Sequence, residues 1–254
     1  MKQNLHIIQP SEAHSHTVIF LHGRDSTATE FASEIFESQG SDDKTLPEAL
    51  PSFKWVFPTS RLRNSTRFGT TMSQWFDIWS VDKPQERLEM QKQGLQESIS
   101  EIMEVINDES SIQLDRIILA GISQGCATMI HVLFNSCQTF GGFVGLSGWI
   151  PFVDEIEDIC RTQKEVTERL QRIRAIMGCG TAISDNKACM KTPVFLGHCK
   201  NDEVVPYSNG EALNKALRDL GMSVEWKSYD TGGHWLNEPE GIDDLVRFFK
   251  LSFQ

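Results

Sequence analysis

Residues 116–134 read Arg-Ile-Ile-Leu-Ala-Gly-Ile-Ser-Gln-Gly-Cys-Ala-Thr-Met-Ile-His-Val-Leu-Phe, so a β-branched run passes through Gly121-x-Ser123-x-Gly125 into an apolar helical run. This pattern is typical of a nucleophile elbow, a sharp strand-to-helix turn whose serine needs neighbours without a Cβ two positions away. The turn exposes the serine Oγ above the sheet, with the N-terminus of the helix beneath it. We therefore predict that Ser123 is a nucleophile; an ordinary tight turn is the alternative.

Composition indicates one domain without affinity for polyanions. The chain has 254 residues, 39% of them hydrophobic, and no long Pro/Gly-rich linker. Such a chain can bury one large core, so we expect a single domain over residues 1–254. Thirty-five acidic against 24 basic residues give a formal charge of −11 at pH 7. We expect no nucleic-acid partner, because a phosphate backbone would be repelled on average.

The N-terminal sequence and the cysteines favour a cytoplasmic protein. The opening Met-Lys-Gln-Asn-Leu-His contains no apolar signal core, and no apolar run approaches the ~20 residues of a membrane helix. The six cysteines are scattered without metal-binding spacing, which fits reduced thiols better than a disulfide framework. A Cys179–Cys189 bridge stays open. We expect no stable membrane insertion.

Strand and helix patterns alternate along the chain. Apolar runs typical of buried strands precede Ser123 and occupy residues 17–21, 53–57, 142–146 and 193–196, with an outer strand at 224–229. Amphipathic helices are expected after Ser123 and over residues 84–107, 209–220 and from about 239 onward. This alternation predicts an α/β fold with a mostly parallel sheet.

Two further residues are needed to activate Ser123. A serine hydroxyl is a poor nucleophile at neutral pH, so an imidazole must accept its proton and an anion must orient the imidazole. After such an elbow the acid and the histidine follow in the order Ser, Asp, His. Asp202 and His234 stand at these places. One rival base and two rival acids remain open: His198, Glu203 and Asp230.

The oxyanion formed by attack of Ser123 needs two fixed hydrogen-bond donors. An elbow supplies one from the residue after the nucleophile and one from the loop after the first core strand. These are the backbone N–H groups of Gln124 and Arg24. No metal pattern, P-loop or Gly-x-Gly-x-x-Gly is present, so we expect a hydrolase without metal or other cofactor.

Six motifs in order resemble those of the acyl-protein thioesterase/lysophospholipase-like carboxylesterases, a family of α/β-hydrolases. They are Leu21-His22-Gly23, Trp75-Phe76-Asp77, Gly121-Ile122-Ser123-Gln124-Gly125, Ser147-Gly148-Trp149-Ile150-Pro151, Asp202-Glu203-Val204-Val205-Pro206 and Gly233-His234. The resemblance implies an α/β-hydrolase fold and a triad of Ser123, Asp202 and His234. It also implies that the substrate is an acyl thioester or ester, presented on an acylated protein or a carrier protein. Trp149 is then expected beside an acyl groove.

Three departures from the family concern the substrate more than the chemistry. Arg24-Asp25 stands where the family usually has an apolar residue and then Gly before the Asp, and Cys126 replaces a usual Gly. Residues 153–191 are longer than the family norm. Divergent members resemble stand-alone thiohydrolases that release polyketide chains from a carrier protein. A repurposed fold that binds a ligand or partner, or performs a non-hydrolytic cyclisation, is the other alternative.

Two expectations concern the walls of the site. Trp75 lies in an aromatic loop, which fits a substrate-binding wall as well as packing onto the body. Residues 153–191 carry one apolar stripe at helical spacing, from which we expect a lid over the groove beside Trp149. A helix packed on the outside of the sheet, without contact to substrate, is the alternative. The stripe consists of Val166, Leu170, Ile173 and Met177.

Overall fold

A seven-stranded sheet forms the centre of the protein. The computed structural model describes residues 4–178 and 187–251. The strand order is β1-β3-β2-β6-β7-β8-β9, and all neighbours pair in parallel except β1, which is antiparallel to β3. The mostly parallel sheet predicted from the sequence is thus confirmed. Its strands are β1 (Leu5–Ile8), β2 (His16–Leu21), β3 (Phe53–Pro58), β6 (Ile117–Ile122), β7 (Gly142–Leu146), β8 (Val194–Cys199) and β9 (Val224–Tyr229).

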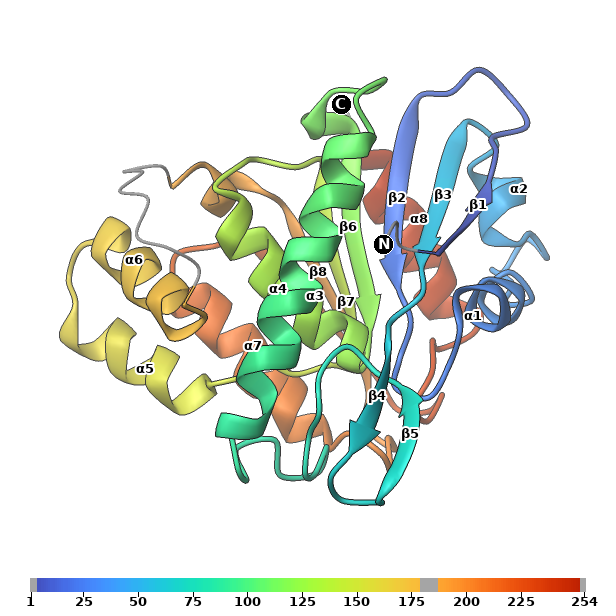
Figure 1. Ribbon diagram of the computed structural model, residues 1–254. Coiled ribbons are helices and arrows are strands. Elements are labelled where there is room, and N and C mark those ends of the chain that lie inside the picture. The colour runs from blue at the N-terminus through green and yellow to red at the C-terminus, as the bar shows by residue number, and fades with distance from the viewer. Residues whose placement is uncertain (1–3, 179–186, 252–254) are drawn as a thin grey trace.

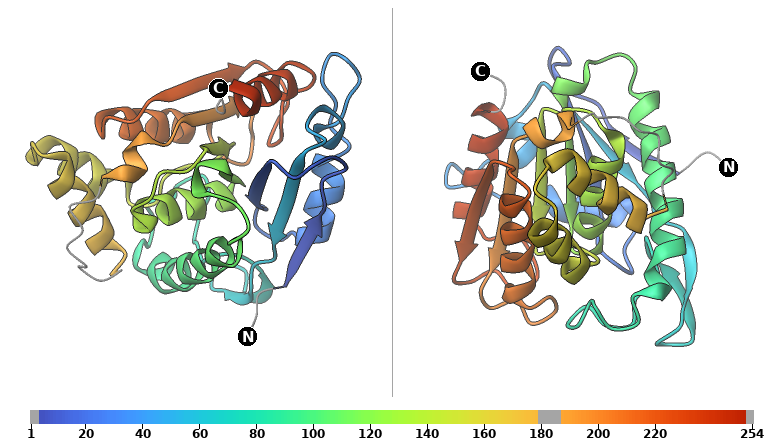
Figure 2. Two further views of the ribbon diagram at one scale, coloured as in Figure 1. Left: turned by 90° about the horizontal axis from the view of Figure 1, so that it is seen from above. Right: turned by 90° about the vertical axis from the view of Figure 1, so that its left-hand side faces the viewer.

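Helices cover both faces of this sheet (Figures 1 and 2). One core cluster contains the buried faces of α3, α4 and α7, and a second contains those of α1 and α8 together with Leu46 of α2. The bounds are α1 (Ala28–Ile35), α2 (Leu46–Ala49), α3 (Glu89–Asp108), α4 (Gln124–Ser136), α5 (Val153–Thr162), α6 (Val166–Ile176), α7 (Tyr207–Asp219) and α8 (Glu240–Leu251), with short 3-10 turns η1 (Leu114–Arg116) and η2 (Ala188–Lys191). This is the layered α/β-hydrolase arrangement that the resemblance implied.

The burial of the central strands explains why the fold could be predicted from the sequence. Every residue of β6 and β7 is buried, as expected for parallel strands that have helices on both faces. Polar loops can then occur only at the strand ends. Ser123, Asp202 and His234 follow the carboxyl ends of β6, β8 and β9, so the sheet brings three distant segments to one edge.

Three strands escaped the sequence prediction. The edge strand β1 lies in what reads as a polar tail, and residues 61–80 contain a hairpin of β4 (Leu62–Ser65) and β5 (Thr70–Ser73). The hairpin lies beyond the carboxyl ends of the parallel strands (Figure 1). Its strands are mostly exposed or half-buried and carry polar side chains, so they show no apolar alternation.

The segment 153–191, expected to be an insertion and called so below, contains two α-helices in its described residues, where one helix was expected. α5 and α6 pack against each other and against α7 and α4 at the left of Figure 1. Three residues of the predicted stripe, Leu170, Ile173 and Met177, are buried in the core cluster around α4. The described part of the insertion thus buries its apolar face against neighbouring helices.

Two findings concern the cysteines and the helices of the described residues. The five described cysteines are free, and Cys179, one half of the bridge left open, lies outside the described residues. Within residues 4–178 and 187–251, none of the helices combines the length and the apolar character needed to cross a bilayer.

Candidate active site

Ser123 occupies a strained turn between β6 and α4. Its φ of 55° and ψ of −123° place it in a backbone region that residues with a Cβ seldom adopt. A Cβ on Gly125 would collide with the backbone oxygens of Leu21 and His22, and one on Gly121 would collide with the backbone of Gly125. The two glycines therefore let helix α4 approach β2 closely enough for the turn to form.

Asp202 and His234 are joined at the same edge of the sheet. His234 Nδ1 lies 2.8 Å from Asp202 Oδ2. Asp202 Oδ1 accepts the backbone N–H groups of Val204 at 2.8 Å and Val205 at 2.9 Å. Because an ionised carboxylate can only accept, this arrangement assigns the proton of the imidazole to Nδ1 and leaves Nε2 as the basic nitrogen.

The Asp202 carboxylate receives a second imidazole. His198 Nε2 lies 3.2 Å from Asp202 Oδ2 and 3.0 Å from the carbonyl oxygen of Val205. Burial by itself would raise the pKa of Asp202, but hydrogen bonds from His198 and His234 outweigh burial and hold that pKa well below its usual range. The acid therefore stays ionised beside the histidine.

The rivals are placed elsewhere. His198 is 2% exposed and is absent from the cavity that contains Ser123, so it supports the Asp202 loop rather than facing that cavity. Asp230 points to Lys200 Nζ at 2.7 Å on the surface, and Glu203 is exposed. Of the acids considered from the sequence, only Asp202 contacts His234 in the described structure.

One cavity of about 370 Å³ brings Ser123 and His234 together. Loops from both halves of the chain, helix α1 and the β4–β5 hairpin build its walls. Two of its apolar residues, Phe68 and Val204, are 58% and 46% exposed, which fits the rim of a site that an apolar group could cover. The lining residues are Gly23, Arg24, Asp25, Ser26, Phe31, Glu34, Phe68, Met72, Val81, Ile122, Ser123, Val204, His234 and Trp235.

Of the two amides expected to bind an oxyanion, one belongs to a residue of the cavity wall and the other to the residue after Ser123. Arg24 lines the cavity, and Gln124 follows Ser123 as the first residue of α4. Within the described part of the chain, neither backbone N–H makes a hydrogen bond to a protein acceptor. The Gln124 side chain is instead fixed to the backbone next to it: its Oε1 accepts Trp75 N–H at 2.9 Å and its Nε2 donates to Phe76 O at 2.7 Å.

Trp75 and Trp149 do not contact the cavity, contrary to expectation. Both side chains are buried, at 0% and 1% exposure, and neither lines the cavity around Ser123. Trp75 Nε1 donates to the carbonyl of His22 at 2.9 Å, and its backbone N–H donates to Gln124 Oε1, so Trp75 links the loop after β2 to the elbow. The sequence places both tryptophans near the site but does not reveal that their rings point into the core.

The expected lid is not part of the cavity wall either. No described residue of the segment 153–191 lines it. α5 and α6 lie beside α4 and α7 because the stripe of α6 is satisfied by the core there. The walls come instead from the hairpin and from residues such as Met72 and Val81, for which the sequence carries no distinct signal.

Cys126 and His22 are close to Ser123 in space but are unsuited to react. Cys126 is buried, and burial raises the pKa of its thiol to about 12. Its Sγ occupies space that a Cβ on Gly145 or Gly148 would need, so the thiol packs against these two glycines. Burial lowers the pKa of His22 to about 4, and its Nε2 accepts the N–H of Ser60 at 3.0 Å.

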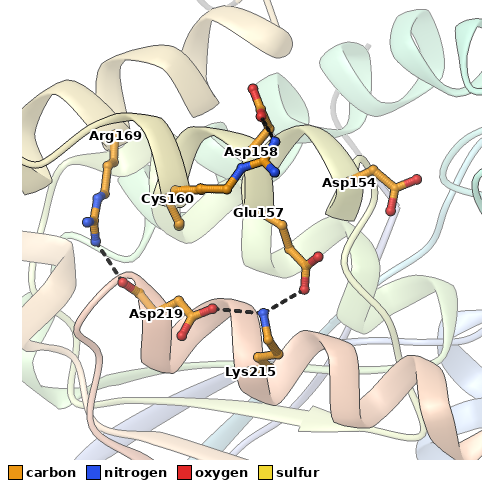
Figure 3. Close-up of a pocket in the computed structure, with 8 residues that line it drawn as sticks. Asp154, Glu157, Asp158, Cys160, Arg169, Lys215 and Asp219 are labelled. Atoms are coloured by element: carbon orange, nitrogen blue, oxygen red, sulfur yellow. Dashed lines mark hydrogen bonds and ion pairs between the residues drawn. The ribbon is translucent and has the colours of Figure 1, made fainter.

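A second, larger cavity of about 490 Å³ lies between α5, α6 and α7 (Figure 3). Most of its charged groups pair with one another or with the backbone. Lys215 Nζ lies 2.8 Å from Glu157 and 3.0 Å from Asp219, and Arg169 donates to the carbonyl of Asp219 at 2.7 Å. The network links the insertion to α7 and contains no residue predicted to react. Among the described residues, no group of three or more His, Cys, Asp or Glu side chains could hold a metal ion.

Comparisons with known proteins agree with the fold. The chain matches the model of the phospholipase/carboxylesterase family over residues 2–172 and 164–252. An acyl-protein thioesterase 1 of Cryptococcus neoformans is 30% identical over 207 residues, which cover 80% of this chain and 73% of that protein. Acyl-protein thioesterase 1 of Saccharomyces cerevisiae is 28% identical over 250 residues, covering 96% and 95% of the two chains.

A solved structure extends the likeness to three dimensions. The crystal structure of Zea mays acyl-protein thioesterase 2 superposes with a TM-score of 0.75 at 24% identity, covering 99% of this chain and 100% of that one. Fold and sequence together define a serine ester hydrolase of the α/β-hydrolase class. The chain belongs to the phospholipase/carboxylesterase family.

Proposed function

We propose that this chain hydrolyses acyl thioesters or carboxylic esters through an acyl-enzyme on Ser123, with His234 as general base and Asp202 as the acid that orients it. One observation carries the proposal. The Asp202–His234 pair, joined at 2.8 Å, has its imidazole on the wall of the cavity that also contains Ser123. The sheet topology brings the three loops to one edge, and the residues they carry there are the serine, imidazole and carboxylate that a serine hydrolase needs.

The reaction follows from the donors and acceptors in place. His234 Nε2 accepts the proton of Ser123 as Oγ attacks the carbonyl carbon, and the amides of Arg24 and Gln124 bind the resulting oxyanion. The imidazolium then gives its proton to the leaving thiol or alcohol as the C–S or C–O bond breaks. Water, deprotonated by the same His234, attacks the acyl-enzyme and releases the carboxylic acid and free Ser123.

The substrate class is drawn from the relatives. Those named above are acyl-protein thioesterases, so we propose that the acyl group reaches the site as a thioester or ester, including one on an acylated protein. The same cavity would accept an acyl group from a carrier protein. Nothing in the relatives supports a role in polyketide biosynthesis, and we do not retain that alternative.

Labelling with a fluorophosphonate probe tests the proposal directly. The wild-type chain should form one adduct, and Ser123→Ala should form none and lose hydrolysis, because the covalent route is removed while Ala fits the same turn. Ser147→Ala is a matched control: Ser147 also follows a central strand with a positive φ of 44°, but it does not line the cavity. An unlabelled wild type would favour a fold used for ligand binding. Near-normal turnover in Ser123→Ala would make the proposal wrong.

A further inference from the structure

The cavity around Ser123 contains a cation without a carboxylate partner. Arg24 is the only Arg or Lys among the described residues that line it. None of the ion pairs within 4–178 and 187–251 includes Arg24, although Asp77 and Asp25 lie near enough to act on it electrostatically. An arginine stays protonated in proteins, so the wall of the cavity holds a positive charge that no direct ion pair within the described residues neutralises.

The Arg24 guanidinium is held by neutral groups. Its Nε donates to Gln74 Oε1 at 3.1 Å, and its Nη2 donates to Ser65 Oγ at 2.8 Å. The ring of Phe68 lies 5.1 Å from its Cζ, within the range of a cation–π contact. Its Nη1 has no partner in the described structure and is not among the buried unpaired nitrogens, so it is open to a ligand. The side chain is thus fixed in place with donors to spare.

The acidic residues of the cavity do not cancel this charge. Asp25 and Glu34 also line the cavity, but both are exposed, whereas Arg24 is half-buried. Water and salt screen exposed charges more strongly than a partly buried one. A negatively charged group that enters beside Arg24 therefore meets an attractive field, and a guanidinium fork suits a carboxylate.

We propose that Arg24 makes this hydrolase selective for substrates with an anionic group, in particular a carboxylate, a few bonds from the scissile carbonyl. The anionic group is placed near the scissile carbonyl because one residue, Arg24, offers its backbone N–H to the oxyanion and its side chain to the cavity. Apolar lining residues such as Met72 and Val81 accommodate the alkyl part between the two ends. The proposal rests on the proposed function of Ser123 and deepens it.

Two pairs of thioesters locate the anion on either side of the scissile bond. On the acyl side, the mono-adipoyl thioester is compared with the hexanoyl thioester of the same neutral thiol. On the leaving-group side, the hexanoyl thioester of mercaptoacetate is compared with that of mercaptoacetamide. The quantity measured is the ratio of kcat/KM for the anionic and the neutral member of each pair. The wild type should favour the anionic member in at least one pair, and added salt should reduce the preference.

Arg24→Met keeps the length and the backbone N–H but removes the charge, and it should lower that ratio about tenfold. Arg24→Lys should retain part of the ratio, since it keeps the charge without the fork. Arg67→Met is the matched control, because Arg67 stacks on the same Phe68 ring, at 5.6 Å, but does not line the cavity. Its ratio should equal that of the wild type.

Three results would overturn the inference. The first is a wild type without preference in either pair, and the second is an unchanged kcat/KM ratio in Arg24→Met. The third is a fall of this ratio in Arg67→Met equal to that in Arg24→Met, which would reveal only a diffuse surface field. Suppose one of these results is obtained while the neutral thioesters are hydrolysed and Ser123→Ala abolishes that hydrolysis. Then only the proposed role of Arg24 is wrong, and the proposed function stands. Hydrolysis that persists in Ser123→Ala removes the proposed function and this inference together.

Discussion

At the scale of single residues, the Asp202 carboxylate connects stability and chemistry. It accepts two backbone N–H groups on one oxygen and lies within reach of two imidazoles on the other. These contacts keep it ionised despite its burial, and they fix the loop from which it acts. A change at Asp202 should therefore affect the rate through the orientation of His234.

We expect Asp202→Asn to lower kcat by several orders of magnitude, about 10⁴ in a comparable triad, while leaving the fold intact. The amide presents an N–H₂ as well as an oxygen, so it cannot hold the same tautomer of His234. Steady-state kinetics with a neutral thioester measure the effect, and circular dichroism verifies the fold. Asp230→Asn is the control, because Asp230 pairs only with Lys200 at the surface. A larger loss in that control would assign the acid elsewhere.

The two tryptophans expected beside the substrate lie outside the cavity wall for one shared reason. Motif and chain order were enough to predict that Ser123, Asp202 and His234 lie at one edge of the sheet, because their spacing relative to strands follows from parallel-sheet topology. For Trp75 and Trp149, the sequence indicates proximity to the site but contains nothing about side-chain direction. The direction is decided by a buried acceptor, the carbonyl of His22, and by core packing that only the structure reveals.

At the scale of elements, the strongly apolar strands and the helices with clear stripes were predictable, and the weakly patterned ones were not. The β4–β5 hairpin is held by contacts from outside itself, such as Arg24 to Ser65 and Arg63 to Glu97. Such tertiary contacts outweigh local propensity, which is why a polar loop in the sequence becomes part of the cavity wall. The insertion shows the opposite case: its stripe was predicted, but not the surface that covers it.

The position of α6 yields a prediction that distinguishes a lid over the substrate from a helix that only stabilises the core. Leu170 is 1% exposed and belongs to the core cluster around α4. Leu170→Ala should lower the free energy of unfolding by about 2–4 kcal/mol through lost burial and a cavity. The relative kcat/KM values for short and long acyl chains should stay as in the wild type, because no described residue of α6 lines the cavity.

Urea unfolding and a series of acyl thioesters measure the two effects of Leu170→Ala separately. Gln171→Ala, the exposed neighbour on the same helix, should change neither. A shift in chain-length preference in Leu170→Ala without a loss of stability would support the lid that the sequence suggested. It would argue against a helix that only stabilises the core.

At the scale of the whole molecule, the sheet gathers the reactive loops at one edge and encloses titratable groups between its layers. His131 lies inside α4 with 0% exposure, between the rings of Phe134 and Phe152. Its Nε2 lies 3.3 Å from the carbonyl of Pro151, and its Nδ1 has no partner in the described structure. Burial lowers the pKa of His131 to about 4, and that of His22 likewise.

The sign of the resulting pH dependence follows from proton uptake. Between the unfolded pKa of 6.5 and the folded value of about 4, the unfolded chain binds more protons at His131 than the folded one. Stability therefore falls as the pH drops through this window. Acidification also reduces the charge of −11, which weakens self-repulsion and acts in the opposite direction. This change in self-repulsion is common to all variants. It cancels when the pH-dependent loss of stability of one variant is subtracted from that of another.

We expect the wild type to lose stability on going from about pH 7.5 to about pH 5, with His131 contributing about 2 kcal/mol of that loss. His131→Gln keeps a donor near Pro151 but cannot titrate, so its loss over the same interval should be smaller by that amount, even if the variant is less stable at neutral pH. Urea unfolding midpoints and slopes at both pH values measure it. The exposed His14 gives the matched control, and His14→Gln should behave as the wild type does. An equal loss in His131→Gln and wild type would mean that His131 is protonated as readily in the folded chain as in the unfolded one, against the burial that α4 imposes.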